Sequence, residues 1–216
     1  MRKISILTGA ALAVVFCLNV PGQDVPGKKD VKGLTARTSA ADYQAHAQAG
    51  TVTIAADLAG HGVPTSDGTY ENENYTVVEV GLFGPPAARL NVSYKDFSLR
   101  INGKKGLLPA QPYEGVFGSL KDPEWVAPNG AEAKSKGAMG AGGGGGQDAA
   151  PAPARMPMNL RLAMEQKVAK AALPEGERVL PGAGLLFFQQ GGKTSGLKSV
   201  ELIYNGAAGK ATLALQ

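Results

Sequence analysis

Three carboxylates stand close together in one short polar segment of the chain. Asp67, Glu71 and Glu73 fall within the run from Asp67 to Asn74, which is also rich in other oxygen donors. Calcium binds six to eight oxygen ligands, and a loop of this composition between two strands can supply several of them. The spacing lacks the EF-hand register, because Gly68 follows a single acidic residue. The segment predicts a calcium site with Asp67, Glu71 and Glu73 as ligands, and a hydrated turn is the alternative.

Nucleophilic catalysis is poorly supported by the residues available. Ser66, His61 and Asp57 are the right types for a triad, but they lie in one loop and no Gly-x-Ser-x-Gly turn is present. His46 is the only other histidine, which excludes a three-histidine metal site. We therefore expect a protein that is not an enzyme, with no catalytic residues and no cofactor.

Aromatic side chains give a better indication of binding. Tyr113, Phe117 and Trp125 occur in one proline-rich stretch, together with charged residues. Such a mixture can stack on sugar rings or anchor a protein partner. The alternative is that these aromatics cover an open edge of the core. We take the three residues as candidate contacts to a ligand or partner.

The first residues indicate export. Arg2 and Lys3 precede an apolar run over 4–20 that Pro21 ends, which is typical of a signal peptide cleaved near Gly22. We expect residues 1–22 to be removed and the protein to act outside the cytoplasm, in the periplasm or secreted. The only cysteine, Cys17, lies inside the apolar run behind the bulky Phe16, which disfavours lipid attachment. Cleavage leaves no membrane span and no thiol, hence no disulfide.

The charge balance excludes a nucleic-acid partner. Loss of Arg2 and Lys3 from the 22 basic residues leaves 20 against 18 acidic ones, and the lysines are scattered. A protein that binds a phosphate backbone needs a basic stripe, which this pattern does not form. The expected partner is an envelope protein or glycan.

The remaining chain predicts one mainly β domain. Residues 23–48 have no sustained apolar period and read as a flexible leader, followed by a single domain over 49–216. A Gly/Pro-rich stretch over 130–157 predicts a disordered insert, and the four-residue spacing of Leu160, Met164 and Val168 predicts an amphipathic helix over 159–173 capped by Asn159. Strands are expected at 51–56, 75–83, 97–101, 107–109, 184–189, 199–204 and 210–215.

The order of these motifs resembles secreted bacterial immunoglobulin-like domains of unknown function, of the envelope lipoprotein type, and exported proteins of soil-type Gram-negative bacteria. The resemblance is carried by YTVVEVGLF, NVSYKDFSLRINGKK, LPEGERVLPGAGLLFF and VELIYNGAAGKATLAL. It implies a single immunoglobulin-like antiparallel β-sandwich in an extracytoplasmic setting, into which the helix and the Gly/Pro-rich loop are inserted. The resemblance offers no catalytic residues to transfer.

These observations lead to one functional expectation and one alternative. The expected function is that of an exported, non-enzymatic envelope protein, acting through its β-sandwich as an interaction or structural module. The alternative is an extracytoplasmic binding protein for a small ligand, a glycan or calcium.

Overall fold

The computed structural model describes residues 31–126, 156–190 and 197–216. The signal peptide predicted over 1–22, the start of the predicted leader and nearly all of the predicted insert lie outside these residues. The described strands are β1 (Ala45–Ala49), β2 (Val52–Gly60), β3 (Gly62–Thr65), β4 (Gly68–Asn72), β5 (Tyr75–Phe83), β6 (Arg89–Val92), β7 (Phe97–Ile101), β8 (Leu108–Gln111), β9 (Leu120–Lys121), β10 (Gly176–Val179), β11 (Gly182–Gln189), β12 (Val200–Gly206) and β13 (Gly209–Ala214). The helix α1 spans Met158–Ala171, and 3-10 turns occur at η1 (Ala40–Asp42), η2 (Tyr94–Asp96) and η3 (Tyr113–Ser119).

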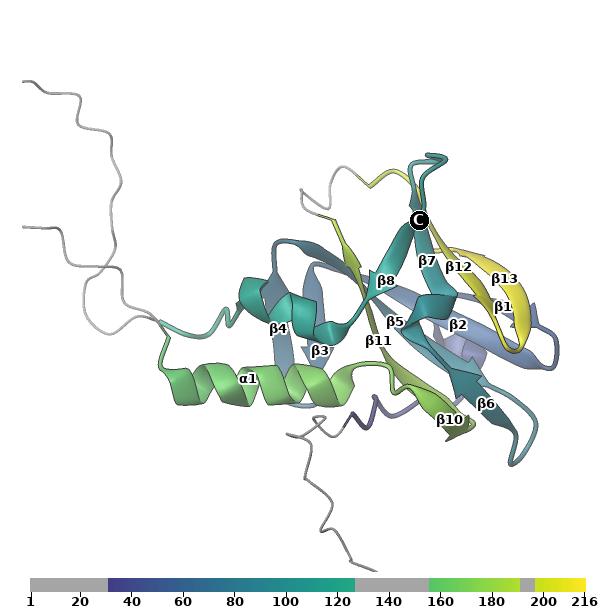
Figure 1. Ribbon diagram of the computed structural model, residues 1–216, viewed down its shortest axis with the longest axis horizontal. Helices are drawn as coiled ribbons and strands as arrows, with labels where there is room; N and C mark the ends of the chain where they lie inside the picture. Colours follow the sequence, from purple (N-terminus) through teal and green to yellow (C-terminus); the bar gives the residue numbers. More distant parts are fainter. Residues whose placement is uncertain (1–30, 127–155, 191–196) are drawn as a thin grey trace, which may run out of the picture.

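Eight strands form one antiparallel sheet in the order β1-β2-β5-β11-β8-β7-β12-β13. The two edge strands, β1 and β13, lie side by side, so the sheet curls into a nearly closed barrel (Figure 1). The Gln44 side chain spans this seam, because its Nε2 donates to the carbonyl of Leu215 and its Oε1 accepts from the Leu58 amide at 3.2 Å. The mainly β, antiparallel class is as predicted; eight strands form the curled sheet, and the others form the small sheets β10-β6 and β3-β4-β9.

Two apolar clusters lie on opposite faces of the same strands. Even-numbered side chains of β5 and β11, including Val78, Val80 and Leu186, point into the barrel core with Leu99 and Leu202. Odd-numbered side chains point outward, because successive residues of a strand face opposite sides. These outward residues form a second cluster with the hairpin β3–β4, η3 and α1, made up of Val63, Tyr70, Tyr75, Val77, Val116, Met164, Val168, Ala171, Ala172, Leu185 and Phe187. The strand predicted at 75–83 is therefore present, as a central strand covered on both sides.

The helix α1 lies along the outside of the barrel, over this second cluster (Figure 1). Its residues are mostly strong helix formers, and Pro157 and Pro174 flank it. The helix begins at Met158 and its N-cap is Pro157, not the predicted Asn159. Leu160 was predicted on the buried face, but it is 47% exposed, because the first turns of α1 extend past the cluster. No helix among the described residues is long and apolar enough to cross a bilayer.

Part of the predicted flexible leader is ordered structure, so the boundary at 48 is wrong. Ala45 to Ala49 pair with β2 over five residues as strand β1. The sequence does contain a strand pattern here, since the alanines at 45, 47 and 49 alternate with His46 and Gln48 in a two-residue period.

The polar segment that contains the predicted calcium ligands lies in a hairpin. Strand β2, which overlaps the predicted strand 51–56, continues to Gly60, and the following residues form the hairpin β3–β4, whose second strand contains Glu71. Tyr70 and Asn72 point inward and are buried, which gives the polar run a partly buried face. The strands predicted at 97–101 and 107–109 correspond to β7 and β8, which pair as a hairpin, and Asn102 and Gly103 between them have positive φ.

Candidate functional site

A cavity opens where β8 and β11 separate. The two strands pair only through Gln111 with Phe187 and Ala110 with Phe188. Beyond that point the edge of β11 is bonded by other segments: the Leu173 amide donates to the Leu185 carbonyl at 2.9 Å, and the Leu34 amide donates to the Ala183 carbonyl at 2.9 Å. The space left between β8 and these segments is the inter-strand cavity, of about 320 Å³.

The exit of α1 approaches β11 closely because of a glycine. A Cβ atom at Gly184 would lie 2.4 Å from the Cα of Leu173 and 2.6 Å from its backbone nitrogen. Any larger residue would therefore collide with backbone, which cannot move aside as a flexible side chain can. Gly184 lets the chain leave α1 alongside β11, where Ala172 and Leu173 line the cavity.

The inter-strand cavity has an apolar floor and a polar rim. Apolar residues come from β11, from the end of α1 and from the first described residue: Val31, Ala172, Leu173, Leu185, Leu186 and Phe187. Polar and aromatic residues come from η2, β8, η3 and the start of β10: Tyr94, Gln111, Tyr113, Glu114, Glu175 and Arg178. A floor of this kind with a few convergent polar groups is typical of a small-molecule site.

Local hydrogen bonds fix part of the rim. The Ser93 hydroxyl donates to Glu175 Oε1 at 3.2 Å, and Arg178 Nε donates to the Glu175 carbonyl at 3.2 Å. The η2 turn that carries Tyr94 is capped by Ser93, whose Oγ accepts from the Lys95 amide at 3.3 Å. Ser93 therefore connects the position of Tyr94 with that of the Glu175 carboxylate.

Tyr113 is the aromatic residue of the proline-rich stretch that lines the cavity. Burial, together with the hydrogen bond to Glu114 and the charge of that carboxylate, raises the pKa of Tyr113 to about 12. A neutral phenol beside a carboxylate is a hydrogen-bond donor over the whole physiological pH range.

The structure brings together two of the three predicted aromatic contacts. The rings of Tyr113 and Phe117 lie 5.8 Å apart, and both pack against the second apolar cluster beside Val116. Trp125 is half-buried in a turn after β9 and lines neither described cavity. Tyr113 and Phe117 thus cover the outer core, the alternative considered from the sequence, and Tyr113 also faces the inter-strand cavity.

The three predicted calcium ligands are spread over the β3–β4 hairpin. Asp67 Oδ2 lies 3.1 Å from Lys167 Nζ, Glu73 pairs with Lys121, and Glu71 is exposed in β4. The hydrogen bond from Lys167 lowers the pKa of Asp67, with a smaller effect from the Ser66 hydroxyl. Within 31–126, 156–190 and 197–216, no group of three or more Asp, Glu, His or Cys side chains is arranged to hold a metal ion. Lysine pairing at Asp67 and Glu73 disfavours calcium.

A second, more open hollow lies beside this hairpin. It has a volume of about 780 Å³ and is lined by His61, Gly62, Thr69, Glu71, Asn72, Glu73, Lys121 and Pro123. His61 Nδ1 lies 2.9 Å from the Tyr75 carbonyl, and the buried Asn72 amide donates to the His61 carbonyl at 2.9 Å. Asn72 Oδ1 also accepts from the Tyr75 amide at 2.7 Å, so its side chain holds the hairpin to β5.

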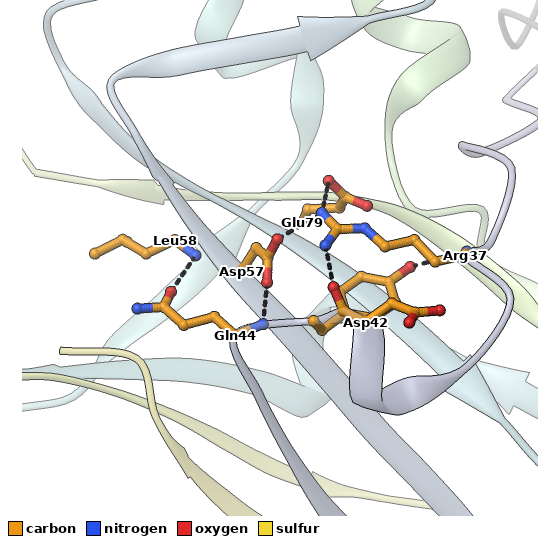
Figure 2. A network of polar contacts seen from close by, with 7 residues as sticks. Arg37, Asp42, Gln44, Asp57, Leu58 and Glu79 are labelled. Atoms are coloured by element: carbon orange, nitrogen blue, oxygen red, sulfur yellow. Dashed lines mark hydrogen bonds and ion pairs between the residues drawn. The ribbon is translucent and has the colours of Figure 1, made fainter.

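Arg37 forms an ion-pair network that sequence reasoning missed (Figure 2). Its Nη2 lies 2.5 Å from Asp57 Oδ2 and 3.1 Å from Glu79 Oε2, and its Nη1 donates to the Asp42 carbonyl at 2.6 Å. The guanidinium also lies 4.2 Å from the centre of the Tyr43 ring, within the range of a cation–π contact. The network joins the N-terminal segment to the outer face of β2 and β5.

Tyr43 packs over Gly81 in the same network. A Cβ at Gly81 would lie 2.6 Å from Tyr43 Cζ, and the Tyr43 and Phe83 rings meet edge to face at 5.9 Å. The outer face of β5 is therefore covered by two different groups of residues: α1 and the β3–β4 hairpin cover Tyr75 and Val77, and the N-terminal segment covers Glu79 and Gly81. We regard the Arg37 network as structural, and the inter-strand cavity as the candidate site.

Comparison with protein-family models, with curated proteins and with solved structures finds no match for this chain.

Proposed function

We propose that the protein is an exported, non-catalytic binding module of the cell envelope, which takes a small organic ligand into the inter-strand cavity. The observation that carries the proposal is the cavity itself, with its apolar floor on β11 and its polar rim from η2, η3 and β10. The proposed location, in the periplasm or secreted, rests on the charged start and apolar run of residues 1–22. The immunoglobulin-like classification belongs to the same proposal and rests on the order of sequence motifs alone.

Ligand binding can be tested by NMR with a fragment library. We expect a subset of fragments to shift amide resonances of Gln111, Glu175 and Leu185, which lie around the cavity. Fragments that shift only the hairpin residues around His61 would move the site to the open hollow and contradict the proposal.

An interaction role is the second candidate, with a protein partner. The observation in its favour is the exposed start of α1, where Met158 and Leu162, one helical turn apart on the same face, are 67% and 46% exposed. Apolar side chains gathered on a surface commonly contact another protein. Crosslinked capture from the native envelope tests this role: a partner retained by the wild type and lost with Leu162→Ser would support it. Equal recovery with both proteins would place the contact elsewhere.

A further inference from the structure

We propose that the inter-strand cavity binds a saccharide of one or two rings, held between Tyr94 and Tyr113 and hydrogen-bonded by Gln111, Glu114, Glu175 and Arg178. This inference rests on the proposed binding function and names its ligand class. Three features of the cavity support a saccharide: the kinds of side chain that line it, the hydrogen bonds that hold some of them, and its size.

Two tyrosines of separate elements line the same small space. Tyr94 comes from η2 and Tyr113 from η3, and both are half-buried, so part of each side chain remains accessible. Pyranose rings present C–H groups on their faces, and these pack against the faces of aromatic rings. Tyrosine suits such a site because its ring is apolar while its hydroxyl still forms a hydrogen bond.

The polar rim matches hydroxyl groups, which both donate and accept hydrogen bonds. Glu114 and Glu175 supply acceptors, Arg178 supplies several N–H donors, and Gln111 supplies both kinds. Glu175 is held by Ser93, and Arg178 Nε by the Glu175 carbonyl, so two of these groups are positioned before any ligand arrives. Groups fixed in advance lose little conformational freedom on binding.

The same lining disfavours other ligand classes. Two carboxylates against one guanidinium leave the rim without the excess positive charge that a phosphate or a polyanion requires. A purely aliphatic ligand would contact only the apolar floor and would form no hydrogen bond with the polar rim. The volume of about 320 Å³ lies near the lower end of the range of about 300–1,000 Å³ for ligand sites, which limits the ligand to a short saccharide.

Calorimetric titration with defined sugars tests the inference. The purified protein is titrated with cellobiose, maltose and chitobiose, alongside the variants Arg178→Ala, Glu175→Gln and Tyr94→Ala. Arg178 and Glu175 are exposed, so their variants should fold even if Tyr94→Ala does not. Matched controls are Arg161→Ala, an exposed arginine on α1, and Trp125→Ala, a half-buried aromatic residue outside the cavity.

We expect at least one disaccharide to bind, with a loss of about ten-fold or more in affinity for Arg178→Ala and Glu175→Gln and less than about two-fold for both controls. Binding that the rim variants leave unchanged would overturn the inference. If no sugar bound while apolar fragments still shifted the cavity amides, the saccharide class would be wrong and the binding function would stand. If neither bound, both would fail.

Discussion

Arg37 shows how one charged residue can anchor a whole N-terminal segment. Its side chain is 33% exposed, and those of its partners Asp57 and Glu79 are 27% and 16% exposed. Removing the guanidinium leaves two carboxylates near each other in a half-buried position, where unpaired charge is costly. We expect Arg37→Ala to lower the free energy of unfolding by about 1–2 kcal/mol, discounted for the solvent that reaches the pair.

A second ion pair serves as the control for this prediction. Arg89 pairs with Glu177 at 3.0 Å, but the side chains are 60% and 63% exposed. Exposed pairs contribute about 0–1 kcal/mol, so Arg89→Ala should change stability by less than Arg37→Ala. Equal losses for the two variants in urea titrations would show that burial does not set the strength of the Arg37 network.

Tyr113 should make stability depend on alkaline pH. Its pKa is raised from 10.0 to about 12 in the folded protein, so the folded state holds the phenolic proton more tightly than the unfolded chain. The stability linked to this proton is fully present below pH 10 and is lost as the pH rises toward 12. Between pH 10 and 12, we expect the free energy of unfolding to decrease less with rising pH for Tyr113→Phe than for the wild type.

Other tyrosines titrate in the same range, so the measurement is the difference between the two proteins. Burial also raises the pKa of Tyr43 and of Tyr204, and both remain in the variant. Superimposable stability curves for wild type and Tyr113→Phe above pH 10 would contradict a raised pKa at Tyr113.

At the scale of elements, the contact between α1 and β11 depends on Gly184. Because a Cβ there would meet the Leu173 backbone at 2.4 Å, Gly184→Ala must displace the end of α1 or bend β11. We expect a loss of at least about 2 kcal/mol in unfolding free energy, measured by chemical denaturation. Gly106→Ala is the control, since a Cβ at Gly106 has no atom within 4 Å. If Gly184→Ala were as stable as this control, the contact between β11 and the end of α1 would have room for a Cβ atom, which would contradict the prediction.

Elements with a strong local pattern were predictable, and those fixed by distant contacts were not. The strand 75–83 was placed to the residue, because its apolar residues on both faces and the prolines after it leave little ambiguity. Strand β6, from Arg89 to Val92, was not predicted, and its residues pair with residues of β10 that lie 84 to 90 positions later in the chain. Short strands of this kind owe their conformation to tertiary partners, which propensity alone does not reveal.

The candidate site was predicted only in part, for the same reason. Tyr113 was selected as an aromatic contact, but its neighbours Tyr94, Glu175 and Arg178 lie in segments far away along the chain. No local spacing links them, because they meet only where β8 separates from β11. Arg37 was overlooked because its residue type fits a flexible leader equally well.

At the scale of the whole molecule, the barrel has one weak seam. Strand β1 pairs only with β2, and its neighbour β13 pairs only with β12, whereas β5 and β11 have partners on both sides. Buried amides in strands that are paired on both sides exchange their hydrogen only when a large part of the molecule unfolds. We expect hydrogen exchange to be slowest in β5 and β11 and distinctly faster in β1. Uniform protection across all eight strands would show that the barrel is fully closed.

Strands β5 and β11 separate two cores that are packed independently of each other. Even-numbered positions pack into the interior of the barrel, and odd-numbered positions contact α1, η3, the β3–β4 hairpin or the N-terminal segment. During evolution, a change in the outer layer can be compensated by odd positions while the even ones stay fixed, and the reverse also holds. Substitutions at odd and even positions of one strand should therefore be independent of each other. Among homologues they would form two sets of covarying residues that alternate along the strand.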